Sequence, residues 1–88
     1  MKIISIILQV AAGICSFKCQ SMDEAIERCR HTWECHCYSY NEVAELCLLK
    51  YSVGWTLEAD DAFTSACLYG ELMDGYYMEG GDLDACDL

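Results

Sequence analysis

The feature that most constrains this chain is its cysteine content: eight cysteines among 88 residues, with no proline. About 9 % cysteine in so short a chain is typical of a disulfide-stabilised domain. A hydrophobic core of this size rarely contributes more than about 3–5 kcal/mol to the free energy of folding, so we expect cystines to supply much of the rest. The length allows one domain at most, which excludes a two-domain enzyme and an ordinary nucleotide-binding fold.

The first residues predict export from the cell. Lys2 is followed by an almost wholly apolar run over residues 3–10 and then by small residues at 11–13. This order is typical of a signal peptide, and the run is too short for a bilayer span, which needs about 20 apolar residues. We expect residues 1–16 to form the signal peptide, with cleavage after residue 12 to 16, and the protein to be secreted. A buried N-terminal strand or helix is the alternative interpretation.

The cleavage point decides the number of cysteines in the mature chain. Cleavage after Ala12 keeps Cys15 and leaves eight cysteines, whereas cleavage after Ser16 leaves seven. An oxidising extracellular compartment makes disulfides the default state of these residues. An odd number would leave a free thiol or a bridge to a second chain, and we would then expect a disulfide-linked dimer.

Acidic residues dominate the charge: 15 Asp and Glu stand against five Lys and Arg, for a formal net charge of −10. Such a surface repels phosphate backbones, so nucleic acid is not expected as a partner. Residues 79–88 are predicted to be an acidic C-terminal tail. Its Asp82, Asp84 and Asp87 lack the spacing of an EF-hand loop, which favours a solvated tail over a calcium site.

Local patterns predict one helix and several strands. Ser21 and Glu24 have the form of a capping box, and apolar residues recur at helical spacing after it, so we expect a helix over about 21–31. The period then changes, and strands are expected near 35–40, 45–51, 63–69 and, more weakly, 75–78. One helix before several short strands indicates an α+β domain, a small disulfide-stabilised antiparallel sheet with the helix packed on it.

The segment from Ser21 to Tyr51 resembles the PAN/apple domain family. That family has a helix with one or two cysteines, then Cys-x-x-Phe-x-Tyr, then Cys-x-Leu-Lys. This chain has a helix ending near Cys29, then Cys35-His36-Cys37-Tyr38-Ser39-Tyr40, then Cys47-Leu48-Leu49-Lys50. It departs from the family at Ala25, where a second helix cysteine is usual, and at Cys37, which is additional. The resemblance implies a PAN/apple-like domain over residues 17–78.

The resemblance also implies a disulfide framework. It pairs Cys29 with Cys35 and leaves Cys47 without its usual partner, a place that either Cys37 or Cys67 could take. Longer members tie their terminal strands together, which Cys19 with Cys86, or Cys19 with Cys67, could do here. Sequence alone does not choose among these pairings.

The candidate chemistry is binding. Zinc held by Cys29, His31 and the Cys35-His36-Cys37 run is less expected than disulfides, and we expect no metal, no cofactor and no catalytic residue. Aromatic side chains are the best ligand-contact candidates, because they supply large contact area at interfaces. Trp33, at the helix–strand junction, is expected in the core. The candidate site comprises the aromatic anchors Trp55, Tyr76 and Tyr77 with an acidic rim of Glu58, Asp60 and Asp61.

These residues and the resemblance together predict a secreted, non-catalytic module that binds an extracellular protein or a carbohydrate. The net negative charge favours a basic protein over anionic sulfated glycans. Two alternatives remain: a cystine-rich effector, such as a venom, salivary or defence inhibitor, and a matrix protein crosslinked through an unpaired cysteine.

Overall fold

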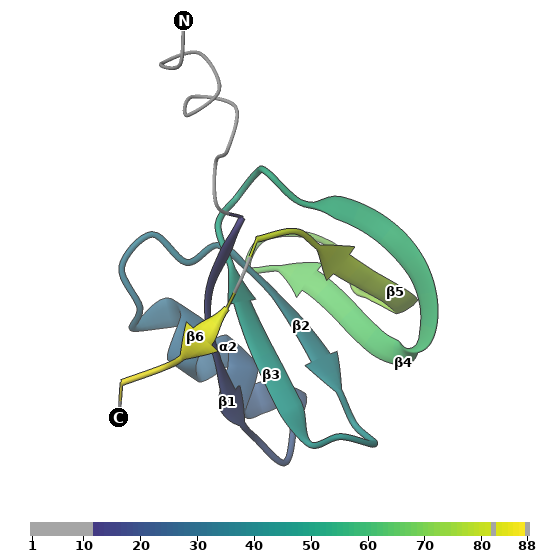
Figure 1. Ribbon diagram of the computed structural model, residues 1–88, viewed down its shortest axis with the longest axis horizontal. Coiled ribbons are helices and arrows are strands. Elements are labelled where there is room, and N and C mark those ends of the chain that lie inside the picture. Colours follow the sequence, from purple (N-terminus) through teal and green to yellow (C-terminus); the bar gives the residue numbers. More distant parts are fainter. Residues whose placement is uncertain (1–11, 82, 88) are drawn as a thin grey trace, which may run out of the picture.

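The computed structural model describes residues 12–81 and 83–87, so most of the predicted signal peptide and Asp82 lie outside it. Within these residues one helix packs on a six-stranded sheet, an α+β arrangement (Figure 1). The strands lie in the order β5-β4-β2-β3-β1-β6. The elements in chain order are β1 (Gly13–Lys18), α2 (Met22–Arg30), β2 (Cys37–Asn41), β3 (Leu46–Lys50), β4 (Thr56–Cys67), β5 (Met73–Glu79) and β6 (Asp84–Ala85).

Helix α2 begins where the capping pattern predicts. The Glu24 carboxylate accepts a hydrogen bond from the Ser21 N–H at 3.1 Å and another from the Gln20 N–H. These bonds satisfy backbone donors that a helix start leaves unpaired. Ala25 and Cys29 are buried on the face that the helix turns toward the sheet.

The main core lies between α2 and one face of the sheet. Side chains alternate along a strand, so the helix-facing residues of β3 are Cys47 and Leu49. Tyr38 of β2 and Ala66 of β4 extend the same cluster on neighbouring strands. The predicted strands near 35–40 and 45–51 therefore form the centre of the fold.

The opposite face of the sheet is covered by the chain itself. The strand β4 bends sharply around one side of the molecule, which Figure 1 shows as a long curved band. Its first part, residues 56–59, pairs only with residues 76–79 of β5, and we call this pair of segments the ribbon. Leu48 and Lys50 are buried beneath the ribbon, together with the ribbon's own Met78, so the sheet has a packed layer on each face.

Small hydroxyl side chains allow this close approach. The Oγ atoms of Ser39 and Ser65 lie 2.6 Å apart, and Ser39 Oγ accepts a hydrogen bond from the Met78 N–H at 3.2 Å. Ser65 donates to the Tyr76 carbonyl at 2.8 Å. At the end of the ribbon the Lys50 ammonium donates to the Gly80 carbonyl at 2.9 Å. These bonds attach β5 to the sheet through groups that burial would otherwise leave unsatisfied.

The sheet is mixed, and the expectation of an antiparallel sheet was correct for every described strand pair except one. The strand β6 runs parallel to β1, pairing Cys15 with Asp84 and Ser16 with Ala85. The Cys15–Cys86 disulfide and a 2.8 Å hydrogen bond from the Cys86 N–H to the Ser16 carbonyl fix the two strands together.

Four disulfides use all eight cysteines. Cys29 is bonded to Cys35, as the resemblance implies. Cys47 is bonded to Cys19, so its assignment to Cys37 or Cys67 was wrong. Instead, Cys37 is bonded to Cys67, which lies directly opposite it in the β2–β4 register.

The pairing of Cys19 with Cys67 or Cys86 was also wrong, and the strand register gives the reason. Cys19 directly follows β1 and continues its register with β3, since its N–H donates to the Glu45 carbonyl at 3.1 Å. Cys47 lies two residues along β3 from Glu45, on the same face of the sheet, and so is the diagonal neighbour that Cys19 bonds. The terminal bridge is formed by Cys15 instead.

The ordered fold extends beyond the predicted domain, residues 17–78. Residues 13–18, predicted partly as signal peptide, form β1, and residues 84–85 of the predicted tail form β6. Ala12 is fully buried, and its carbonyl accepts a hydrogen bond from the Tyr51 N–H at 2.9 Å. A Cβ atom on Gly80 would lie 3.2 Å from the Ala12 Cβ, so the end of β5 packs closely against the start of β1.

Candidate functional site

Three loops meet at one end of the sheet. Cys37, the first residue of β2, lies opposite Lys50 at the end of β3 and opposite Cys67 at the end of β4. Three loop segments therefore lie at the same end of the strands: 31–36, 51–54 and 68–72. We call these three segments together the loop end. The Leu68 N–H donates to the His36 carbonyl at 2.8 Å, which joins two of them directly.

Large apolar side chains are exposed on all three loops. Trp33 is 85 % exposed and Tyr69 is 97 % exposed, with Val53 at 70 % and Leu72 at 54 %. Single exposed apolar residues are ordinary on a protein surface, but several at one end of a small domain are typical of an interaction surface. Trp and Tyr are also the residues most enriched among those that dominate binding energy.

The expectation that Trp33 belongs to the core was wrong. The turn that carries it is closed by the Cys29–Cys35 disulfide and by a hydrogen bond from the Cys35 N–H to the Thr32 carbonyl at 3.1 Å. Glu34 adopts a left-handed conformation with φ of 64°. In this tight turn Cys35 points into the core, and the indole of Trp33 is left in solvent.

A shallow hollow of about 310 Å³ lies at the loop end. Its walls come from His36 of the first loop, Ser52 of the second, and Leu68, Tyr69 and Gly70 of the third, together with the Cys37–Cys67 bridge. The hollow can receive an apolar or aromatic group, with the backbone and the Ser52 hydroxyl as hydrogen-bonding partners.

The charge at the loop end is negative. Glu34 and Glu71 are exposed there, and the three loops contain no Lys or Arg. Within the described residues, Lys18 belongs to β1, Arg28 and Arg30 stand in the last turn of α2 directly before the first loop, and Lys50 is buried. The three loops themselves therefore combine exposed aromatic groups with acidic ones, a composition that favours a positively charged partner over a negatively charged one.

The residues predicted as ligand contacts divide into two groups. Trp55 is half-buried, and its indole N–H donates to the Tyr51 carbonyl at 3.0 Å. Tyr77 is half-buried and stacks on Phe63, with ring centroids 4.3 Å apart. Burial, with Glu79 and Asp60 nearby, raises the pKa of Tyr77. Both side chains thus contribute to packing.

The remaining predicted residues are exposed on the ribbon and the bend that follows it. Tyr76 of β5 lies opposite Ala59 and Glu58 of β4 lies opposite Tyr77, so Tyr76 and Glu58 both belong to the ribbon but face its two opposite sides. Asp60 and Asp61 follow at the bend of β4. The ribbon therefore presents exposed acidic residues and shares no residue with the loop end.

Sequence reasoning did not single out Val53, Tyr69 or Leu72. Two of them precede the turn glycines Gly54 and Gly70, and this was the only local signal that they belong to loops. Their common location depends on strand register, which no local pattern specifies.

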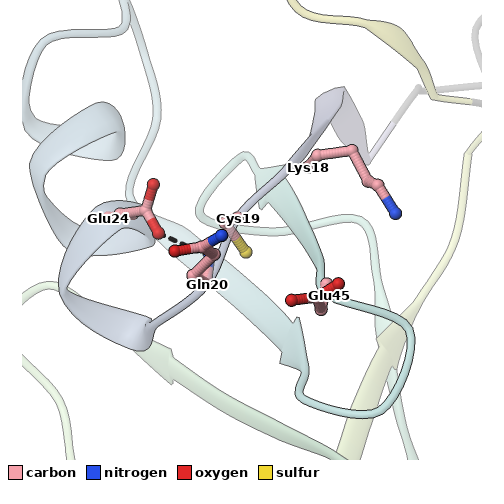
Figure 2. A pocket seen from close by; sticks show the side chains of 5 residues that line it. All are labelled: Lys18, Cys19, Gln20, Glu24 and Glu45. Atoms are coloured by element: carbon pink, nitrogen blue, oxygen red, sulfur yellow. Dashed lines mark hydrogen bonds between the residues drawn. The ribbon is translucent and has the colours of Figure 1, made fainter.

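A second hollow, of about 200 Å³, lies beside the start of α2 and is lined by Lys18, Cys19, Gln20, Glu24 and Glu45. Figure 2 shows the Glu24 carboxylate turned toward Gln20, while the Lys18 side chain extends away from Glu24. Because Glu24 is already occupied in capping the helix, this hollow is a weaker candidate than the loop end.

Neither a free thiol nor a metal-ligand cluster occurs in the described part of the chain. Every cysteine is oxidised, so none is available as a thiolate nucleophile or zinc ligand. Residues 12–81 and 83–87 contain no group of three or more His, Cys, Asp or Glu arranged to hold a metal ion. No helix among those residues is long and apolar enough to cross a bilayer.

Comparison with known proteins finds no family model, no curated protein and no solved structure that matches this chain significantly. The candidate site therefore rests on the geometry of this molecule alone.

Proposed function

We propose that this protein is a secreted, non-catalytic binding module with a PAN/apple-like fold, and that its loop end recognises an extracellular protein with a basic surface. Four disulfides support secretion, since such bonds form and persist in oxidising compartments. The PAN/apple assignment is supported by the packing of α2 on the sheet and by the Cys29–Cys35 bridge at the end of the helix.

One observation carries the proposal: the exposure of Trp33, Val53, Tyr69 and Leu72 on three loops at the same end of a covalently braced sheet. Loops fixed by disulfides lose little conformational entropy when a partner binds, which favours affinity. The acidic side chains around them favour a cationic partner and speed its association. Because all eight cysteines are paired within the chain, a disulfide-crosslinked matrix protein is less well supported.

The test is capture of a partner by the oxidised protein from the extracellular fluid of its source, followed by affinity measurement with the purified partner. Trp33→Ala and Tyr69→Ala should each weaken binding at least tenfold, because truncating a central aromatic contact commonly costs about 2 kcal/mol or more. These changes should act mainly on dissociation, whereas added salt should slow association.

Val43→Ala provides the matched control. Val43 is as exposed as Trp33, at 87 %, but it lies in the turn between β2 and β3, at the other end of the sheet. Equal binding by all three variants would contradict the loop-end proposal. A partner captured through glycans alone would identify a carbohydrate-binding module instead, and turnover of a substrate would exclude the non-catalytic assignment.

A further inference from the structure

The first part of β4 has an open edge in the middle of the chain. Residues 63–67 of β4 pair with β2 on one side, but residues 56–59 pair only with β5. All seven residues from Thr56 to Ala62 are exposed. An antiparallel strand uses only alternate backbone groups for one neighbour, so the others on residues 56–59 face solvent along the free edge.

An open strand edge is a template for another strand, and proteins usually block it. In the described residues two backbone features interrupt this edge, the irregular register after Ala59 and a hydrogen bond from the Ala62 N–H to the Asp60 carboxylate at 3.0 Å, and both lie beyond residues 56–59. Residues 56–59 contain neither proline nor a bulge. Their backbone is therefore available to an added strand.

The acidic side chains along this segment determine which kind of strand can pair with the free edge. Glu58, Asp60 and Asp61 lie within four consecutive residues, and no Lys or Arg occurs between Tyr51 and Leu88. A second copy of this edge would bring two such acidic clusters together, and the repulsion disfavours self-pairing. A strand with Lys or Arg side chains would gain opposite-charge pairs on the same geometry.

We infer that the free edge of β4, at residues 56–59, binds an extended basic peptide by strand addition. Backbone hydrogen bonds supply the affinity in this mode, and the flanking side chains supply the selectivity. Glu58, Asp60 and Asp61 attract the cationic peptide and also prevent pairing between two copies. The site goes beyond the proposed function, because it shares no residue with the loop end.

The test is an NMR titration of the isotope-labelled, oxidised protein with a ten-residue peptide of alternating lysine and threonine at low ionic strength. We expect chemical-shift changes centred on residues 56–59 and slower amide exchange at those positions. Two control peptides carry the same charge as the parent peptide. One is N-methylated at every lysine and the other at every threonine. Because alternate N–H groups of a strand point to the same side, only one of the two controls loses the hydrogen bonds to the edge. Equal binding by both methylated peptides and the parent would show charge attraction alone and would overturn the proposal.

Two triple variants separate the edge from the general negative charge. Glu58→Gln/Asp60→Asn/Asp61→Asn should weaken the peptide about tenfold at low salt. Glu27→Gln/Glu42→Gln/Asp87→Asn removes the same number of charges from exposed positions outside both the edge and the loop end, and should change affinity less than threefold. Equal losses in the two variants would contradict the site, as would self-association of the edge variant without any peptide binding.

The loop-end variant Tyr69→Ala keeps this result independent of the proposed function. The peptide titration should be unchanged in that variant. If Tyr69→Ala loses its protein partner and still binds the peptide, both sites stand. If neither the peptide nor a related basic strand binds the parent protein, the edge proposal fails while the loop-end proposal is unaffected.

Discussion

At the scale of single residues, Lys50 is the most consequential buried group, because a fully buried lysine carries an ammonium into the space beneath the ribbon. Burial lowers the pKa of Lys50, and nearby Glu79 acts in the opposite direction. The ammonium has the Gly80 carbonyl as its hydrogen-bond partner, and it lies 5.6 Å from the Tyr77 ring centroid. The unfolded chain therefore binds this proton more tightly than the folded protein does.

The sign of the pH dependence follows from that difference. Between the lowered pKa of Lys50 and its usual value near 10.5, the unfolded state holds more protons, so the free energy of unfolding rises with pH. Lys50→Met removes this contribution. We expect the stability of the parent relative to Lys50→Met to increase from neutral pH toward about pH 10, measured by urea denaturation of the oxidised proteins. A relative stability that stays flat or falls would contradict this assignment.

Ser39 provides a second prediction at this scale. Ser39→Ala removes the acceptor of the buried Met78 N–H and the partner of Ser65. A buried donor without a partner costs about 1–3 kcal/mol, so the free energy of unfolding should fall by that amount. Ser52→Ala, at an exposed position, is the matched control and should change it by less than about 0.5 kcal/mol. Similar losses in both variants would show that the buried network is unimportant.

At the scale of elements, the helix start can be tested in isolation from the sheet. Glu24→Ala removes the carboxylate that accepts from two backbone N–H groups, and should lower the free energy of unfolding by about 1 kcal/mol. Glu27→Ala makes the same substitution one turn later, where the carboxylate contacts only the exposed His31, so about 0.5 kcal/mol or less is expected. Urea denaturation distinguishes the two, and an equal cost would contradict the capping role.

The same elements show how much of the fold is readable in the sequence. Helix α2 and the strands β2 and β3 could be predicted, because a capping box and a local period each depend on a few neighbouring residues. The strand β1 could not be, since residues 13–18 span the predicted cleavage point of a signal peptide and show no clear alternation of apolar and polar residues. The ribbon and β6 were missed or underestimated because both are held by long-range contacts, such as Lys50 with Gly80 and Cys15 with Cys86.

The candidate site follows the same division. The exposure of the ribbon's acidic and aromatic residues could be predicted from local sequence. Charged side chains favour the surface, which applies to Glu58, Asp60 and Asp61, and Tyr76 follows the turn residue Gly75. The loop end could not be, because only the register of Cys37 with Lys50 and Cys67 brings its three loops together. Trp33 shows the limit most clearly: its size favours the core, but the disulfide-closed turn holds it outside.

At the scale of the whole molecule, the four cystines should contribute unequally to stability. Restricting the unfolded chain is worth more for longer loops, about 4 kcal/mol for Cys15–Cys86 at a separation of 71 and about 2 kcal/mol for Cys29–Cys35 at a separation of 6. Cys15→Ala/Cys86→Ala should therefore lower the free energy of unfolding by about 4 kcal/mol in urea denaturation. A loss below that of Cys29→Ala/Cys35→Ala would show that lost packing at the buried pair outweighs loop closure.

The Cys15–Cys86 bridge has one more consequence, for the response of the molecule to proteases. It closes the backbone from β1 to the last strand into a covalent ring that contains nearly every described residue. A single cut in an exposed loop, such as 51–54 or 68–72, opens that ring but releases no fragment. The nicked chain would migrate as one band without reductant and as two with it. Both fragments would stay attached to the same sheet. The loop end and the free edge of β4 would therefore keep their positions after one peptide bond has been cut.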